Sequence, residues 1–291
     1  LRIPTAVDHA SEYRYRNPIT GNKTLTIIIS QSGETADTLA ALKEAKKRGS
    51  HTLAIVNVVG SSIANAADDV IYTWAGPEIA VATTKGYSTQ LSVLYLFAVW
   101  AARLLKTADG ARLDKIFDDI LMLPELTERV ILAEPQIKET AKHCGDPKSL
   151  FFIGRNIDYA VSLEASLKLK EISYIHSEAY AAGELKHGTI SLIEEGRTVI
   201  ALAAYEELFD KLLSNIKEVK ARGARVLACA TVGHAEIAKE AESVIYIPKI
   251  DPLLLASLEV VPFQLYAYYV ALYNGCDIDK PRNLAKSVTV E

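Results

Sequence analysis

The segment Ser30–Thr35, which reads Ser-Gln-Ser-Gly-Glu-Thr, carries residues suited to holding an anion. It lies between an apolar, β-branched run and a helical pattern, and a helix N-terminus offers unpaired backbone N–H groups and a partial positive charge. Ser30, Ser32 and Thr35 add hydroxyl donors, and Gly33 lets the backbone approach a ligand closely. Ordinary capping of the helix by Ser32 or Thr35 is the alternative, and composition alone favours neither.

A shift of 174 residues aligns one half of the chain with the other. Between Leu39 and Tyr72, 15 of 34 positions are identical to their counterparts 174 residues later, without a gap. Unrelated segments would share roughly two or three, so the pattern indicates internal duplication. The counterpart of Ser30–Thr35 is Ala204–Phe209, which has two glutamates and neither serine nor glycine. Because the fold therefore does not require the serine loop, we expect one phosphate site per chain.

Apolar strands alternate with helical patterns in both halves. This predicts an α/β fold class with two tandem three-layer α/β/α sandwiches, each built on a parallel sheet. The expected strands are 24–29, 52–56 and 70–72 in the first half and 150–153, 198–203, 226–230 and 244–247 in the second. The expected helices are 36–48, 77–105, 113–142 with a break at Pro124, one from 158, 207–222 and 252–274. The counterpart of strand 150–153 and its helix would precede residue 1, so the first copy lacks them.

These patterns divide the chain into four parts. They are a first domain truncated at its N-terminus at 1–107, connecting helices at 108–145, a second domain at 146–276 and a C-terminal tail at 277–291. The tail is polar and extended, and it is either docked or a disordered end with an incidental Lys286. A further polar segment, Val81–Lys85, precedes a helix, and its hydroxyls favour capping over ligand contact.

Composition excludes several classes of protein. The 291 residues are 49% hydrophobic and 23% charged, which suffices for packed cores, and a net charge of −4 argues against a general nucleic-acid surface. Cys144, Cys229 and Cys276 lack the spacing of a zinc site, which favours a reducing, cytoplasmic setting. The most apolar stretch, 91–102, is shorter than the roughly 20 residues that span a bilayer, so we expect a buried helix and no membrane segment.

A second group of candidate residues lies in the second half. Glu164, Lys168 and Glu171 share one stripe of a predicted helix, where the ordinary interpretation is a surface ion-pair ladder. The run 176–188 that follows is small, polar and irregular, and it ends at His187-Gly188. A long loop this rich in Glu, Lys and His between core elements indicates function.

Four motifs together resemble the isomerase half of the glutamine:fructose-6-phosphate aminotransferase (isomerizing) family, also called glucosamine-6-phosphate synthases. The motifs are Ser30–Thr35, Leu167–His176, Gly183–Gly188 and Pro281–Glu291. The resemblance implies two sugar-isomerase (SIS) domains that pair into a homodimer. It also implies synthesis of glucosamine 6-phosphate from fructose 6-phosphate and ammonia drawn from glutamine, with no metal or coenzyme.

The resemblance further implies a role for each matching residue. Six would bind the hexose 6-phosphate, the phosphate through Ser30, Gln31, Ser32 and Thr35 and the sugar through Val81 and Thr83. Four would take part in the chemistry: Glu171 as the base between C1 and C2, Lys168 beside it, His187 from the neighbouring subunit in ring opening, and Lys286 as the imine-forming amine. These residue types suit those tasks, since carboxylates act as bases, histidine titrates near neutrality and lysine forms imines.

The chain also departs from that family. Nothing in it resembles the glutaminase half, so ammonia would come from a glutaminase domain absent here. The first-copy turn Cys-Gly-Thr-Ser, which completes the sugar site in relatives, is missing as well. Two alternatives remain: a non-catalytic sugar-phosphate sensor, which has no use for Glu171, and a SIS-type deglycase, which His187 and Lys286 disfavour.

Overall fold

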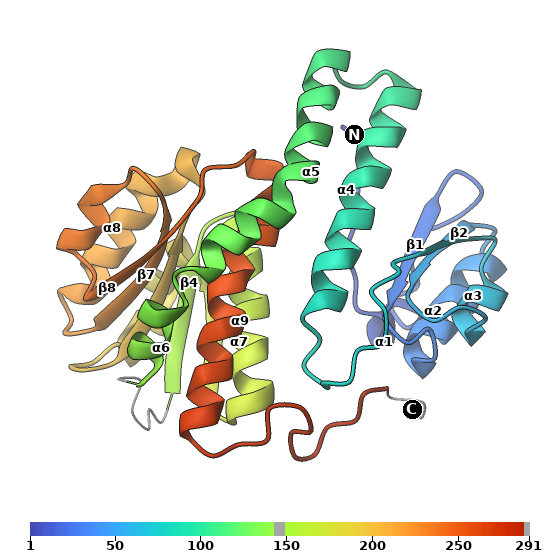
Figure 1. The fold of residues 1–291 in the computed structure, drawn as a ribbon. Helices are drawn as coiled ribbons and strands as arrows, with labels where there is room; N and C mark the ends of the chain where they lie inside the picture. The colour runs from blue at the N-terminus through green and yellow to red at the C-terminus, as the bar shows by residue number, and fades with distance from the viewer. Residues whose placement is uncertain (143–148, 288–291) are drawn as a thin grey trace. The chain divides into compact units, whose positions relative to one another are not determined.

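The computed structural model describes residues 1–142 and 149–287, and these form two compact units (Figure 1). The first contains Leu1–Asp114 and the C-terminal segment from Asn283, and the second contains Lys115–Arg282. Each unit is built on a parallel sheet, so the predicted α/β class is confirmed. The expected strands all form, each within one residue of its predicted bounds.

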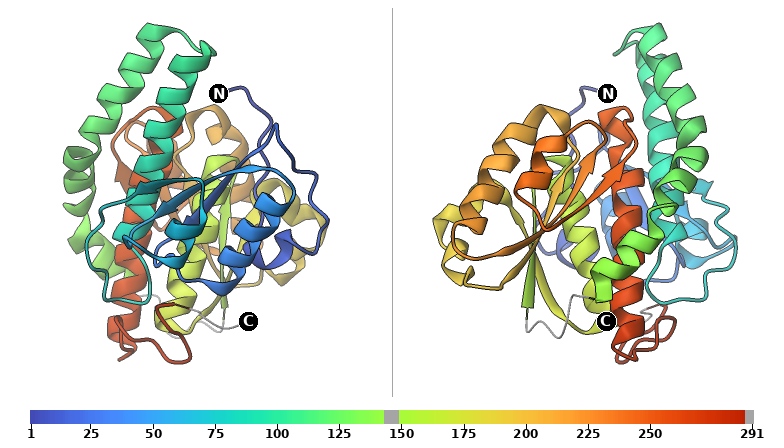
Figure 2. Two further views of the ribbon diagram at one scale, coloured as in Figure 1. Left: turned by 90° about the vertical axis from the view of Figure 1, so that its right-hand side faces the viewer. Right: turned by 60° about the vertical axis from the view of Figure 1, so that its left-hand side comes forward.

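The first unit carries a three-stranded sheet in the order β1-β2-β3. Its elements are α1 (Ala10–Tyr13), β1 (Leu25–Ser30), α2 (Ala36–Lys47), β2 (His51–Val56), α3 (Ser62–Ala66), β3 (Asp69–Tyr72) and α4 (Lys85–Leu105). Helices α2 and α3 lie against the sheet, as the left view of Figure 2 shows. Leu42 and Ile63 on these helices and Ala54 and Val56 on β2 form the core beneath them.

The second unit carries a five-stranded sheet in the order β5-β4-β6-β7-β8. Its strands are β4 (Ser149–Gly154), β5 (His176–Ala181), β6 (Thr198–Ala203), β7 (Arg225–Thr231) and β8 (Ser243–Ile247). Its α-helices are α5 (Gly110–Ile131, which begins in the first unit), α6 (Glu134–Lys142), α7 (Ile157–Ser173), α8 (Phe209–Lys220) and α9 (Leu255–Tyr273). The 3-10 helices are η1 (Ala182–His187), η2 (Thr189–Leu192), η3 (Glu206–Leu208), η4 (Ala235–Lys239) and η5 (Pro252–Leu254).

Helices cover both faces of this second sheet (Figure 1). Helix α8 packs on one face together with η1, and α7 and α9 pack against each other on the other face. At the shift of 174, strands β1-β2-β3 correspond to β6-β7-β8. The counterparts of β4 and α7 at this shift would precede residue 1, and residues 2–7, the counterpart of β5, form no strand.

Four expectations about helices and loops were wrong. The helix predicted at 77–105 begins only at Lys85, and the run 176–188 contains strand β5 and helix η1 because β5 pairs along β4 at the edge of the sheet. Pro124 lies inside α5, whose buried Ile120 and Leu123 hold it to the core, and the break falls at 132–133. The stretch 91–102 is not a buried helix, because only three residues of α4 are buried.

Two helical segments are long and apolar enough to cross a bilayer by length and composition alone, namely α4 and Pro252–Tyr273. The second of these is largely buried inside its unit, where Phe263 meets Phe152 of β4 edge to face. Of the cysteines, Cys229 is buried and Cys276 partly buried, both as free thiols, while Cys144 lies outside the described residues.

Gly154 ends β4 where α7 passes close to the strand. A Cβ atom there would lie 2.4 Å from the carbonyl carbon of Asp158 and 2.5 Å from the backbone nitrogen of Tyr159. We therefore expect Gly154→Ala to destabilise the protein by about 1–3 kcal/mol through overpacking, measured by urea unfolding. Gly110→Ala is the matched control, because no atom lies within 4 Å of its added Cβ and alanine favours the start of α5. Equal stability of the two variants would contradict this account.

Candidate functional site

The serine loop (Ser30–Thr35) connects β1 to α2 and gathers its hydroxyls at the helix N-terminus. The hydroxyl of Ser30 accepts a hydrogen bond from the Gly33 amide at 3.1 Å and lies 3.3 Å from the hydroxyl of Thr35. Ser32 accepts from the Glu34 amide at 3.2 Å. Thr35 is the N-cap residue of α2, yet its side chain makes no capping hydrogen bond. The capping alternative for Thr35 is therefore wrong, and its hydroxyl stays within the loop.

Gly33 packs closely against Ser61, whereas the sequence predicted close approach of a ligand at this glycine. Its φ of +70° lies in the left-handed region, and a Cβ there would lie 2.1 Å from the hydroxyl oxygen of Ser61. The glycine therefore serves first the packing of the loop against the segment before α3. Glu34 is held on the same side: the Ser62 hydroxyl and amide donate to its carboxylate at 2.6 and 2.8 Å, and these bonds lower its pKa.

Gln31 faces α4 and not its own helix. Its Oε1 accepts from Gln90 at 3.4 Å, whereas its buried Nε2 finds no hydrogen-bond partner among residues 1–142 and 149–287. A buried amide donor left unpaired costs free energy, which makes this atom suited to a ligand oxygen.

Glu78 is a residue that sequence analysis missed. Its carboxylate accepts hydrogen bonds from the amides of Thr84, at 2.9 Å, and Gly86, at 3.2 Å, and thereby caps α4. The Thr84 side chain makes no capping bond, so the expected capping of α4 by its own hydroxyls is wrong. No local motif signals Glu78, because it reaches the helix across a turn of irregular backbone.

The C-terminal tail docks on the first unit. The amine of Lys286 donates to the carbonyl oxygen of Ala80 at 2.6 Å and to the hydroxyl of Thr83 at 3.0 Å, and it lies 3.9 Å from Glu78. The next residue, Ser287, places its hydroxyl 3.1 Å from that of Ser32. The tail thus brings the predicted imine-forming lysine to the predicted sugar-lining and phosphate-binding residues. Val288 and Val290 lie outside the described residues.

The second unit holds the lysine–glutamate cluster on α7. Lys168 is 5% exposed, and its amine lies 2.6 Å from Glu171 and 3.6 Å from Glu164. The surface-ladder interpretation is therefore wrong, because a buried amine is shared by two carboxylates. Burial raises the pKa of Glu164, an effect that the Lys168 charge opposes and the Glu171 charge reinforces. Glu164 belongs to this cluster although we did not count it among the site residues, and its spacing from Lys168 is the signal that could have found it.

His187 ends helix η1 and is exposed, and Gly188 follows it with a φ of +146°. Among the described residues no hydrogen bond or ion pair joins His187 to Glu171. The structure thus brings together Ser30, Ser32, Thr83 and Lys286 in the first unit and Lys168 and Glu171 in the second.

The turn that corresponds to the serine loop is already occupied by a carboxylate of its own unit. Asp158 accepts hydrogen bonds from the amide of Tyr205 at 3.0 and 3.3 Å, and Tyr205 is the counterpart of Gln31. Asp158 is 1% exposed, and it lies against Glu259, which is 0% exposed. Burial raises the pKa of both carboxyls well above their ordinary values, so the two share a proton.

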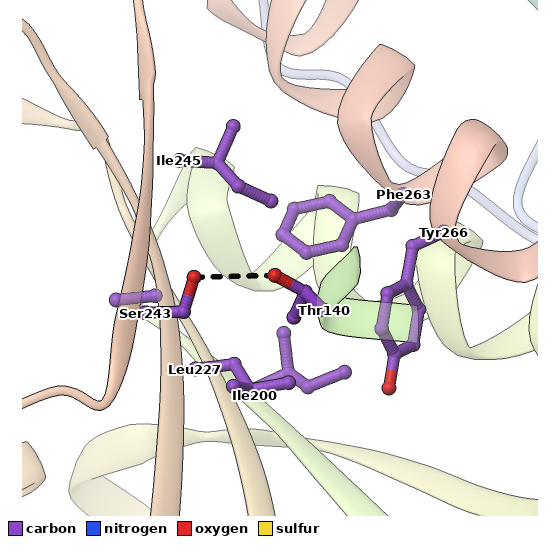
Figure 3. A pocket seen from close by; sticks show the side chains of 8 residues that line it. Thr140, Ile200, Leu227, Ser243, Ile245, Phe263 and Tyr266 are labelled. Carbon is purple, nitrogen blue, oxygen red and sulfur yellow. Dashed lines mark hydrogen bonds between the residues drawn. The ribbon is translucent and has the colours of Figure 1, made fainter. Parts of the chain in front are cut away.

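The enclosed pocket of Figure 3 lies elsewhere, between α6, α9 and the sheet of the second unit. Ile200, Phe263 and Tyr266 line it, and its dashed line is the 3.2 Å hydrogen bond between Thr140 and Ser243. With apolar walls and no charged group it does not suit a sugar phosphate.

Comparison with known protein families identifies the fold. The model of the SIS domain family matches residues 1–100 and 145–273. The chain belongs to the SIS domain family. The solved C-terminal domain of glucosamine-fructose-6-phosphate aminotransferase from Francisella tularensis is 35% identical with a TM-score of 0.92, over 96% of this chain and 80% of that one. The resemblance seen in the four motifs is thereby confirmed.

Curated relatives match this chain over its whole length. Glutamine–fructose-6-phosphate aminotransferase [isomerizing] of Clostridium tetani is 58% identical over 290 residues, which is 100% of this chain and 48% of that protein. The chain thus spans about half the length of the curated relatives it matches. A solved glucosamine-6-phosphate deaminase from Thermotoga maritima is more distant, with 26% identity and a TM-score of 0.75 over 96% of this chain and 80% of its own.

The buried carboxyl pair predicts how stability varies with pH. With folded-state pKa values raised, the folded protein keeps a proton that the unfolded chain releases, so stability is full below the ordinary carboxyl pKa and falls as pH rises. Glu259→Gln keeps a neutral donor beside Asp158, so we expect urea unfolding midpoints that vary less between pH 5 and 8. The control Glu236→Gln, at an exposed residue, retains the wild-type pH dependence. A uniform loss of stability at every pH in Glu259→Gln would count against the shared proton.

Proposed function

We propose that this chain is the isomerase half of a glucosamine-6-phosphate synthase. It binds fructose 6-phosphate, opens its ring, forms an imine with the C2 carbonyl and moves a proton between C1 and C2, which yields glucosamine 6-phosphate. One observation carries the proposal: the tail seats Lys286 on Thr83 while Ser287 contacts the serine loop. The names of the similar proteins support the same activity.

The phosphate binds at the serine loop. The hydroxyls of Ser30, Ser32 and Thr35 and the unpartnered amide of Gln31 supply donors at the N-terminus of α2, where the helix dipole favours an anion. In the described part of the second unit the equivalent position is already taken, because Asp158 accepts a hydrogen bond from the Tyr205 amide.

The sugar lies beside Val81 and Thr83, within reach of Lys286. The Lys286 amine attacks the C2 carbonyl, and the imine forms with loss of water. Ammonia then attacks the same carbon and displaces the lysine amine, which leaves the nitrogen on the sugar and frees Lys286. Because the lysine sits on a docked tail and not on a helix, tail closure over the sugar also excludes water from the reacting carbon.

The proton transfer falls to Glu171. The amine of Lys168, 2.6 Å away, holds this carboxylate in place, as a base acting on one proton requires. His187 comes from the partner subunit of a homodimer and assists ring opening.

The remaining parts of the proposal concern partners and organisation. Ammonia comes from a glutaminase domain outside this chain, the protein acts in the cytoplasm as a homodimer, and no metal or coenzyme takes part. The SIS domains span 1–107 and 146–276, joined by 108–145, and 277–291 forms the active-site tail.

The role of Glu171 as the base is tested with Glu171→Gln, which keeps the shape of the side chain but removes its basic carboxylate. We expect affinity for fructose 6-phosphate to stay within about twofold and turnover with ammonium to fall by at least roughly a hundredfold. Titration calorimetry and a product assay measure the two quantities, with Glu236→Gln as the control. Normal turnover would refute the assignment, and a wild-type protein that binds the sugar without converting it would be a sensor.

The phosphate site is tested with Thr35→Ala. A hydrogen bond to a charged group contributes about 1.5–3 kcal/mol, so its loss weakens binding of fructose 6-phosphate by roughly ten- to a hundredfold. Thr35→Ser keeps the hydroxyl and retains wild-type affinity, and Tyr205→Phe, in the counterpart turn, changes nothing. Equal affinities of all three variants in titration calorimetry would remove the serine loop from the binding site.

A further inference from the structure

The segment that carries His187 is tied to helix α8 by side chains. We call residues 182–188 the His-Gly turn. Within it, Lys186 places its amine 2.8 Å from one carboxylate oxygen of Glu218 on α8. The other oxygen of Glu218 accepts a hydrogen bond from Asn215 at 3.2 Å. Glu218 therefore joins the turn to a residue one helical turn earlier on α8.

The connection continues to the turn between β4 and α7. The Nε of Arg155 donates to the side-chain oxygen of Asn215 at 3.0 Å. The guanidinium of Arg155 also lies against Gly183, where an added Cβ would be 3.0–3.3 Å from its atoms. Arg155, Asn215, Glu218 and Lys186 thus form one polar network, here named the Asn215 network, that reaches the His-Gly turn at both of its ends.

Burial of the Asn215 side-chain amide costs free energy. It is 2% exposed, on the face of α8 whose neighbours Leu212, Ile216 and Val219 pack into the core. A buried amide there is tolerated only because both of its ends are hydrogen-bonded, and an aliphatic residue would fit the apolar face better. Because stability alone would favour an aliphatic residue at this position, the presence of Asn215 indicates that the network has a functional role.

Two backbone positions near the His-Gly turn have unusual dihedral angles. Asn156, next to Arg155, has φ +52° and ψ −120°, a conformation that non-glycine residues rarely adopt. Gly188 has a φ of +146°, so the chain directly after His187 turns at a residue with wide conformational freedom. Ala182 and Leu185 anchor the turn in the core, whereas Lys186 is the residue that fixes its exposed end.

Glu218 is held ionised for this task. Burial raises its pKa, but hydrogen bonds from Lys186 and Asn215 outweigh that effect, and the pKa lies below its ordinary value. An exposed Lys–Glu pair alone contributes little to stability, so the network serves geometry more than stability.

We propose that Asn215 and Glu218 are positioning residues that set the orientation of His187 for ring opening. The role of His187 in this inference rests on the proposed function. The tether, that is, the attachment of the His-Gly turn to α8 by the Asn215 network, rests on geometry alone. Misplacing a catalytic group by about 1 Å can cost roughly a hundredfold in rate, so release of the turn should slow the step in which His187 acts.

The tether itself is tested by hydrogen exchange on the whole chain. Glu218→Ala and Lys186→Met break the network from opposite sides, and Lys217→Ala removes an exposed lysine of the same helix as a matched control. We expect at least a tenfold faster amide exchange in peptides covering 182–188 for the first two variants, with α8 unchanged. Wild-type exchange in that segment would overturn the tether whatever the activity of the protein.

The role in ring opening is tested with two substrates. Fructose 6-phosphate is largely cyclic, whereas its 5-deoxy analogue lacks the hydroxyl that closes the ring and enters the reaction open. With ammonium as nitrogen donor, we expect Glu218→Ala and Asn215→Leu to lower kcat for fructose 6-phosphate about tenfold with little change in KM, and to leave the rate on the analogue unchanged. The double variant Glu218→Ala/His187→Asn should be no slower than His187→Asn alone, because both changes act on one step.

The experiments distinguish failure of the positioning role from failure of the proposed function. Equal loss on both substrates, or additive loss in the double variant, would overturn the positioning role. A wild-type chain that converts neither sugar would overturn the proposed function, and the exchange experiment would still decide whether the Asn215 network holds the turn.

Discussion

The backbone N–H groups at the turn after β1, and at the equivalent turn after β6, are the constraint on which both units are built. A strand that feeds directly into a helix leaves these donors at the carboxyl edge of the sheet, where they need an acceptor. In the first unit the loop's own serine hydroxyls accept from the Gly33 and Glu34 amides. In the second, Asp158 supplies the acceptor from α7, next to Glu259, whose pKa burial raises well above its ordinary value. Two copies of one fold thus meet the same requirement in opposite ways.

This difference decides where charge can be buried. Asp158 and Glu259 are almost fully buried and share a proton, which removes most of the cost of burying two charges. On the same helix α7, Lys168 is buried between Glu164 and Glu171 and remains paired with both. Helix α7 therefore carries near its start Asp158, which pairs with Glu259 of α9, and near its end the Lys168 cluster, which includes the proposed base.

The tail and the His-Gly turn show a shared strategy for groups that must act on a substrate. Lys286 lies on the tail and His187 at the end of the short 3-10 helix η1, so neither lies on a strand or an α-helix. Each segment is fixed by a charged residue from a neighbouring element: Glu78 faces Lys286, and Glu218 holds the residue before His187. Segments with few backbone hydrogen bonds can adjust to a substrate, and such contacts limit how far they stray.

Local pattern predicted the strands well because buried parallel strands are short apolar runs bounded by turns. It failed where distant residues decide the outcome. The start of α4 depends on Glu78, seven residues before it, and β5 is a strand because β4 offers it a hydrogen-bonding edge. Pro124 lacks one donor, but packing of its neighbours keeps α5 continuous.

The sequence by itself determined the duplication, the α/β class, the strands of each copy and the fact that one copy alone carries a serine loop, because these follow from residue periodicity and from a comparison of the halves. Only the tertiary structure decided that Lys168 is buried, that Asp158 occupies the second turn, that Gly33 packs on Ser61 and that the tail rests on Thr83. Such features depend on contacts between residues far apart in the chain, and the free energy of those contacts arises only when the elements pack.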